Sequence, residues 1–197
     1  MNTIRAFLAI ETPIDIQINL KNIIARLNLP ANHSVRWVKA DNIHLTLKFY
    51  GETPKEKIEL LVTKMQQELK DYLPMQLTVS GIGAFPNLSR PRVFWCGIQA
   101  GNELVEIQKR IDSISSAFGF PQENRPFSPH LTLGRVNDRA EFEEVRRVSE
   151  LIRSSSVETI GAIQVSRLTI FSSKLSPGGS IYSPVFHINL KDPSLKS

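Results

Sequence analysis

Four segments of the chain carry an apolar residue every three or four positions, the spacing of an amphipathic helix. The predicted helices span roughly residues 13–27, 54–69, 102–118 and 138–152. In the first two, Thr12 and Thr53 each precede a proline, which predicts a threonine N-cap and a proline at the first helical position. Gly119 is expected to end the third helix, and Phe142 is expected on the buried side of the fourth.

Between these helices lie shorter apolar or alternating runs, which are typical of β-strands. Eight strands are predicted, at residues 4–10, 35–38, 43–50, 75–82, 92–99, 127–136, 163–172 and 181–190. Because strands outnumber helices about two to one, the pattern favours an α+β fold with antiparallel pairing over an alternating parallel sheet. No joint is long enough to be a flexible linker. We therefore expect one domain over residues 1–191, with residues 192–197 as a frayed C-terminal tail.

One tetrapeptide occurs twice and contains two of the four histidines of the chain. His-Leu-Thr-Leu begins at His44 and again at His130. Successive side chains of a strand point to opposite faces, so each histidine shares a face with its threonine, Thr46 or Thr132, while the leucines share the other. Two such strands related by a pseudo-two-fold axis would bring two imidazoles and two hydroxyls to one cleft.

This set of side chains suits the opening or closing of a phosphodiester bond. In-line displacement at phosphorus needs a base on the attacking oxygen and an acid on the leaving oxygen. Imidazole can act as either near neutral pH, because its unperturbed pKa is about 6.5. Threonine hydroxyls can donate hydrogen bonds to the non-bridging phosphate oxygens. Such a mechanism requires neither a metal nor another cofactor.

Zinc binding is the rival chemistry for a pair of histidines, and it needs three or four ligands. Asp41 precedes His44 by three residues, but Phe127 occupies the corresponding position before His130. We therefore expect no metal site. His187, on the last predicted strand, has no threonine two residues later and is expected to be merely solvated or hydrogen-bonded.

Charge and cysteine content add weaker indications. The net charge of +5 favours polyanionic partners, because neutralising phosphates releases counterions. The single cysteine, Cys96, cannot pair within the chain, which indicates a reducing compartment, and its apolar neighbours predict a buried, inert thiol. The apolar stretch at the N-terminus is too short for a signal peptide or a membrane span. We expect a cytoplasmic protein without a membrane segment.

Taken together, the motifs resemble those of the RNA 2′,3′-cyclic phosphodiesterases, also called 2′-5′ RNA ligases, a family of two-histidine phosphoesterases. The matching segments are residues 5–10, 36–38, 44–52, 85–86, 91–95, 127–135, 171–179 and 182. The resemblance runs nearly from end to end. It implies an α+β fold of two pseudo-symmetric lobes, each an antiparallel sheet with helices on its outer face, which face each other across a central cleft.

The resemblance also implies a reaction and a role for each site residue. The family hydrolyses a terminal 2′,3′-cyclic phosphate, on an RNA 3′ end or a nucleotide, to a 2′-phosphomonoester, and 2′,5′ ligation is the reverse reaction on the same site. His44 would be the proton donor and His130 the proton acceptor. Thr46 and Thr132 would hold the substrate, and the arginine after the second motif, Arg135, would bind it as well. No obligate protein partner is implied.

Strict strand alternation conflicts with the implied role of Arg135. It places Lys48 and Gly134 on the face of the histidines and sends Arg135 to the other side. Either Gly134 marks a β-bulge that turns Arg135 toward the phosphate, or Arg135 is a rim residue without a phosphate contact. Lys48 has the right parity, but it has no lysine counterpart in the second motif. A solvated Lys48 is therefore favoured over a phosphate ligand.

Two other functions stay open at this point. A related enzyme would act on another small phosphodiester, such as a nucleotide cyclic phosphate, a 2′,5′-linked oligonucleotide or ADP-ribose cyclic phosphate. A non-catalytic RNA-binding module is the alternative from a different class. The paired histidines and threonines disfavour the module, because binding alone relies on cations and aromatic side chains.

Overall fold

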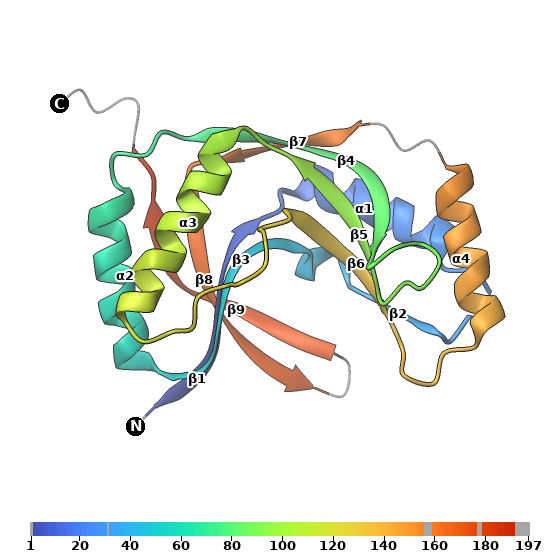
Figure 1. Ribbon diagram of the computed structural model, residues 1–197, viewed down its shortest axis with the longest axis horizontal. Coiled ribbons are helices and arrows are strands. Elements are labelled where there is room, and N and C mark those ends of the chain that lie inside the picture. Colours follow the sequence, from blue (N-terminus) through green and yellow to red (C-terminus); the bar gives the residue numbers. More distant parts are fainter. Residues whose placement is uncertain (1, 31, 156–158, 177–178, 192–197) are drawn as a thin grey trace.

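The computed structural model describes residues 2–30, 32–155, 159–176 and 179–191 (Figure 1). The strands are β1 (Thr3–Glu11), β2 (Val35–Trp37), β3 (His44–Pro54), β4 (Met75–Phe85), β5 (Val93–Gln99), β6 (His130–Val136), β7 (Thr159–Val165), β8 (Arg167–Ser176) and β9 (Gly179–Asn189). The helices are α1 (Ile14–Leu27), α2 (Lys55–Leu69), α3 (Asn102–Ala117) and α4 (Phe142–Ser154), with a short 3₁₀ turn, η1 (Ala40–Asn42). Within these ranges no helix has the length and apolar character needed to cross a membrane.

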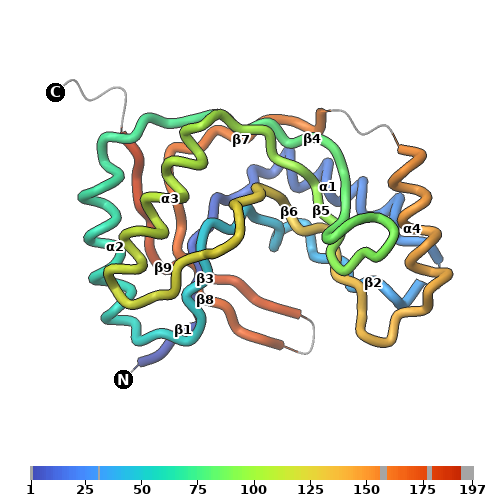
Figure 2. Tube along the Cα trace, viewed as in Figure 1, coloured from blue at the N-terminus to red at the C-terminus, as the bar shows by residue number. Residues whose placement is uncertain are grey.

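The strands form two halves that meet in the middle of one antiparallel sheet. The order is β7-β4-β5-β6-β3-β1-β8-β9, and β2 pairs with β6. Strands β3 and β6 pair through a single residue pair, Leu45 opposite Leu131. The strands on either side of this pair form two lobes, one from β3 to β9 and the other from β6 to β7 in the strand order. Helix α2 packs against β3 and β9 of one lobe and α3 packs against β3 and α2, whereas α1 packs against β7 and α4 of the other lobe. In Figures 1 and 2, α2 and α4 lie at opposite ends of the molecule. The predicted α+β fold of two lobes is confirmed.

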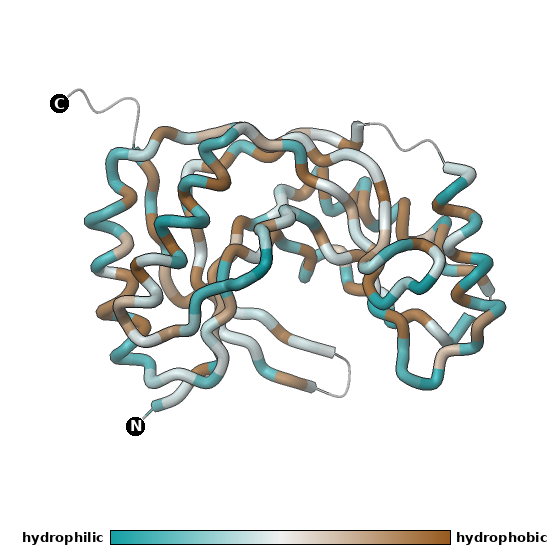
Figure 3. The backbone as a smooth tube through the Cα atoms, viewed as in Figure 1, coloured by the Kyte–Doolittle hydropathy of each residue, from teal (hydrophilic) through white to brown (hydrophobic). Residues whose placement is uncertain are grey.

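The helical periodicity read from the sequence predicts the buried faces of the helices well. In α1 the buried residues are Ile16, Leu20, Ile23 and Leu27, and in α2 they are Ile58, Leu61, Met65 and Leu69. Figure 3 shows apolar and polar positions alternating along these helices. Gly119 follows α3 with a positive φ of 77°, a conformation that favours glycine, and its N–H donates to the Ser116 carbonyl.

The predicted threonine caps are wrong. Helices α1 and α2 begin one residue later, after Pro13 and Pro54 as N-caps. The Thr12 hydroxyl donates instead to the carbonyl of Ile43, 2.8 Å away, which ties the start of α1 to the residue before β3. The Thr53 hydroxyl donates to the Tyr50 carbonyl, 3.1 Å away, within β3 itself. Both hydroxyls therefore anchor strand β3 and cap no helix.

Two further sequence expectations differ from the structure. The predicted strand 163–172 is divided at Ser166 into β7 and β8, which lie in different lobes. No glycine or proline marks the break, since Ser166 alone redirects the chain. Phe142 is 70% exposed, because α4 begins at this residue and not near residue 138. The tail expected at residues 192–197 lies outside the described residues.

Cys96 is fully buried in β5, as predicted. Its thiol donates to the carbonyl of Gly81, 3.1 Å away. Burial raises the pKa of this thiol to about 12, because the thiolate would lose its hydration. At neutral pH the thiol therefore stays protonated and unreactive.

Lys48 is not solvated, and this sequence expectation is corrected. Only 8% of its side chain is exposed. Its ammonium forms an ion pair with Asp112 of α3 and donates to the Pro121 carbonyl, 2.6 Å away. Asp112 also accepts a hydrogen bond from the Glu123 N–H. Lys48 thus joins β3 to α3 and to the loop after it, which forms a wall of the cleft.

Replacing Lys48 by methionine is expected to lower the free energy of unfolding by about 3 kcal/mol, because Asp112 keeps a poorly hydrated charge without its partner. Urea denaturation at pH 7 measures this change. The matched control is the double variant Lys48→Met/Asp112→Leu, which removes both charges and is expected to recover most of the loss. A single variant as stable as the unchanged protein would contradict the role of Lys48 as a structural tie.

Candidate active site

The register of the central pair brings the two motifs together. Leu45 lies opposite Leu131 in antiparallel strands. His44 is therefore level with Thr132, and Thr46 is level with His130. Both leucines are buried in the core, so all four polar side chains lie on the other face of the sheet. A pseudo-two-fold axis through the leucine pair relates the motifs, as the repeated sequence predicts.

Both imidazoles are held by the same backbone contact. His44 Nδ1 lies 2.8 Å from the carbonyl oxygen of Asn42, and His130 Nδ1 lies 2.7 Å from that of Ser128. A carbonyl only accepts hydrogen bonds, so Nδ1 carries a proton in each ring. The nitrogen left to take up or release a proton is therefore Nε2 in both. Sequence reasoning missed this contact, because it involves a backbone carbonyl two residues earlier and no particular side chain.

Aromatic side chains enclose the ring of His44. Phe7 of β1 stacks on it with the ring centroids 4.7 Å apart, and Tyr182 of β9 contacts it edge-on at 5.2 Å. Burial lowers the pKa of His44, because the imidazolium loses hydration, and the hydrogen bond to Asn42 opposes this effect in part. Glu11 is the cross-strand neighbour of His44, and its carboxylate accepts from Thr169, 2.6 Å away.

His130 has an aromatic neighbour of its own. Phe85 of β4 contacts the ring edge-on, with centroids 4.9 Å apart, and Trp95 packs behind Phe85 at 5.2 Å. Each histidine is thus fixed by a carbonyl on one side and an aromatic ring on the other. These aromatic residues come from other strands, so neither motif reveals them.

A cavity of about 760 Å³ lies over the second motif. Thr46, His130, Thr132 and Arg135 all line it. His44 is not among the lining side chains; it lies two residues before Thr46 on the same strand, covered by Phe7 and Tyr182. Other lining residues, which the sequence did not single out, are Phe49, Phe85, Arg92, Gln108 and Arg125.

Arg135 reaches the cavity because β6 contains a β-bulge. Along β5 the pairing passes from Thr132 directly to Gly134, so Leu133 is the extra residue. The bulge reverses the alternation, and Arg135 returns to the side of Thr132. A Cβ atom at Gly134 would lie 2.8 Å from the ring of Trp37. Strict alternation is therefore wrong at this point, and the bulge suggested by Gly134 is present.

Strand β3 contains the same irregularity at the equivalent place. Its pairing with β1 passes from Thr46 to Lys48 and skips Leu47. Lys48 consequently turns toward α3, and Phe49 turns outward to line the cavity. Phe49 and Arg135 are thus equivalent positions in the two lobes: one presents an aromatic ring to the cavity and the other a cation.

The remaining expectations concern metals and the third histidine that lies on a strand, His187. Across the described ranges, no group of three or more His, Cys, Asp or Glu side chains has a metal-binding arrangement. His187 is exposed, and its Nδ1 lies 3.0 Å from the hydroxyl of Thr169. His187 is hydrogen-bonded, as predicted.

Comparison of this chain with known proteins identifies its family. Residues 16–174 match the model of the 2′-5′ RNA ligase superfamily. The RNA 2′,3′-cyclic phosphodiesterase of Methanothermobacter thermautotrophicus is 31% identical, and the alignment covers 91% of this chain and 95% of that protein. The Escherichia coli protein of the same name is 30% identical over 92% of this chain and 93% of its own length.

Solved structures agree with the sequence comparisons. A crystal structure of a phosphoesterase superposes with a TM-score of 0.77 at 28% identity, covering 97% of this chain and 100% of that one. Escherichia coli LigT complexed with 3′-AMP gives a TM-score of 0.75 at 28% identity, with the same coverage. The chain therefore belongs to the 2′-5′ RNA ligase superfamily.

Proposed function

We propose that this protein hydrolyses the 2′,3′-cyclic phosphate at an RNA 3′ end to a 2′-phosphomonoester by acid–base catalysis between His44 and His130. The observation that carries the proposal is the register of the Leu45–Leu131 pair, which sets each histidine beside the threonine of the other motif. Hydrogen bonding at both Nδ1 atoms supports it, because each ring keeps Nε2 for proton transfer. The names of the curated relatives support the choice of substrate.

The proposed reaction is a single in-line displacement. His130 Nε2 takes a proton from water as the water oxygen attacks phosphorus, and the bond from phosphorus to O3′ breaks. His44 Nε2 gives its proton to O3′, which leaves a 3′-hydroxyl and a 2′-phosphate. Proton exchange with solvent then restores both imidazoles. With the 5′-hydroxyl of a second RNA in place of water, the same displacement forms a 2′,5′ bond. Ligation is therefore a second use of the cyclic phosphate with another nucleophile, and not the reverse of its hydrolysis.

The non-bridging phosphate oxygens need donors while their charge develops. In the proposed complex the hydroxyls of Thr46 and Thr132 donate from the two sides of the axis, and the Arg135 guanidinium adds a charged hydrogen bond. These three residues and His130 line one cavity, which supports their acting on a single phosphate. The arginine breaks the symmetry of the site and distinguishes its two ends.

We expect His44→Ala and His130→Ala each to lower kcat by about 10²–10⁴-fold, the usual contribution of one general acid or base. The double variant should lose far less than the product of the two single losses, because both groups act in one step. Turnover of 2′,3′-cyclic AMP measures this, with circular dichroism to verify folding. His33→Ala, which replaces an exposed histidine, is the matched control. Full activity in either single variant would end the assignment.

Turnover is expected to be independent of divalent metals and to yield the 2′-phosphate. Two imidazoles supply a complete acid–base pair without a metal, and no metal-binding group of three side chains occurs among the described residues. Incubation of 2′,3′-cyclic AMP with and without excess EDTA, followed by identification of the product isomer, tests both statements. Activity lost in EDTA and restored by zinc or magnesium would overturn the first. A 3′-phosphate product would reverse the placement of substrate between the histidines.

The rate should rise and then fall with pH, because only the state with His130 neutral and His44 protonated is productive. The two apparent pKa values belong to the coupled pair. Burial under Phe7 lowers the pKa of His44. Phe7→Ala should therefore raise that pKa toward its ordinary value and move one limb of the profile to higher pH. NMR titration of His44 measures the pKa directly; a pKa unchanged or lowered by Phe7→Ala would show that burial is not its cause.

A further inference from the structure

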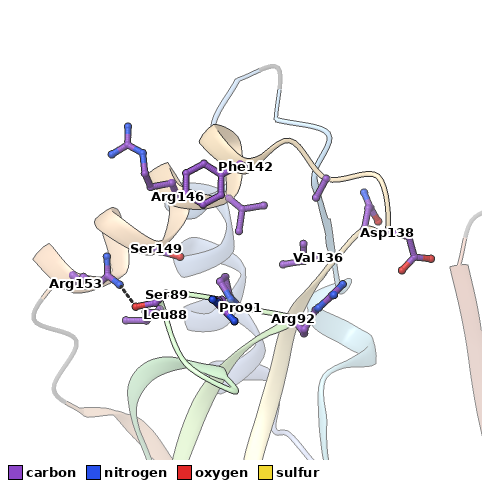
Figure 4. A pocket seen from close by; sticks show the side chains of 14 residues that line it. Leu88, Ser89, Pro91, Arg92, Val136, Asp138, Phe142, Arg146, Ser149 and Arg153 are labelled. Atoms are coloured by element: carbon purple, nitrogen blue, oxygen red, sulfur yellow. Dashed lines mark hydrogen bonds between the residues drawn. The ribbon is translucent and has the colours of Figure 1, made fainter.

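Figure 4 shows a second cavity, of about 600 Å³, in the lobe that contains β6. Its walls are the loop between β4 and β5, the end of β6 and helix α4. Four arginines line it, and we call it the arginine groove: Arg90, Arg92, Arg146 and Arg153.

The arginine groove is electropositive. Across the described ranges, Arg90, Arg92 and Arg153 have no carboxylate within ion-pair distance. Arg146 is bound by Glu143 and Glu150 of its own helix, so it adds little net charge. Asp138 supplies the one carboxylate among the described lining residues, against these three cations. Such a surface attracts phosphates, because their binding releases counterions.

An exposed aromatic ring lines the same groove as these arginines. Phe142, at the first residue of α4, is 70% exposed and lines the groove. Spaced cations with an exposed aromatic ring match what single-stranded nucleic acid requires, since phosphates bind the cations and bases stack on the ring.

The groove is continuous with the catalytic cavity. The Arg92 side chain lines both. Val136 lines the groove and directly follows Arg135, which lines the catalytic cavity. A chain whose terminal phosphate lies at His130 therefore meets the arginine groove as its next binding surface.

We propose that the arginine groove binds the RNA chain on the 5′ side of the terminal cyclic phosphate, with backbone phosphates on Arg90 and Arg153 and a base stacked on Phe142. This role of the arginine groove rests on the proposed function, and it specifies which substrates the enzyme would prefer. The enzyme would prefer oligonucleotide ends to mononucleotides, because a 2′,3′-cyclic mononucleotide fills only the catalytic cavity.

The test compares 2′,3′-cyclic AMP with an eight-nucleotide RNA that ends in a 2′,3′-cyclic phosphate. Arg90→Ala/Arg153→Ala should lower kcat/KM for the RNA by roughly tenfold or more and reduce the slope of log kcat/KM against log salt by about 1.4. Phe142→Ala should lower kcat/KM for the RNA by about 5- to 100-fold, the range for loss of one stacked base. Turnover of 2′,3′-cyclic AMP should stay within about twofold in all variants.

The matched control is Arg147→Ala, which removes an exposed arginine of α4 that does not line the groove. Equal losses with both substrates, or no loss with the RNA, would overturn the proposal. If the unchanged protein hydrolyses neither substrate, the proposed function fails, and the groove is tested by fluorescence anisotropy with the same RNA. Weaker RNA binding by the groove variants but not by Arg147→Ala would then support it, and equal binding would reject it.

Discussion

The site depends on one constraint, the pairing of Leu45 with Leu131 where the two lobes meet. The period of a strand is two residues, so a slip of one residue in either strand would turn that strand's histidine into the core and its leucines into the cleft. Burial of the leucines therefore fixes the face on which His44 and His130 lie. Because only this pair joins β3 to β6, the strands are free to diverge on either side of it, which leaves room for a ligand between the lobes.

The remaining side chains of the site are positioned by the residues that follow each His-Leu-Thr-Leu motif along its strand. A bulge after each threonine reverses the side-chain alternation, so one repeated pattern produces two different ends of the cleft. In β6 the bulge brings Arg135 to the cavity, while in β3 it brings Phe49 there and buries Lys48 against Asp112. The two symmetric histidines thus have an asymmetric surrounding, which suits the proposed reaction because its attacking and leaving groups differ.

Local patterns in the sequence were sufficient to predict the structure where one type of contact determines it. Helical periodicity identified the buried face of α1 at Ile16 and Leu20, and the repeated tetrapeptide identified the four central side chains. The split at Ser166 was not predictable, because β7 and β8 have similar apolar patterns and no glycine or proline separates them. The Nδ1 contacts were equally invisible, because any residue supplies a carbonyl. Phe7 and Tyr182 reach His44 only through the pairing of distant strands.

In the proposed reaction, His44 and His130 each carry out one of the two proton transfers. The most direct measurement uses a cyclic phosphate in which sulfur replaces O3′, since a thiolate leaves without a proton. We expect the His44→Ala variant to recover most of its lost rate on this substrate, whereas His130→Ala should stay impaired by about 10²–10⁴-fold on both substrates. A His44→Ala variant equally impaired with sulfur and with oxygen, or recovery by His130→Ala in its place, would contradict the assignment.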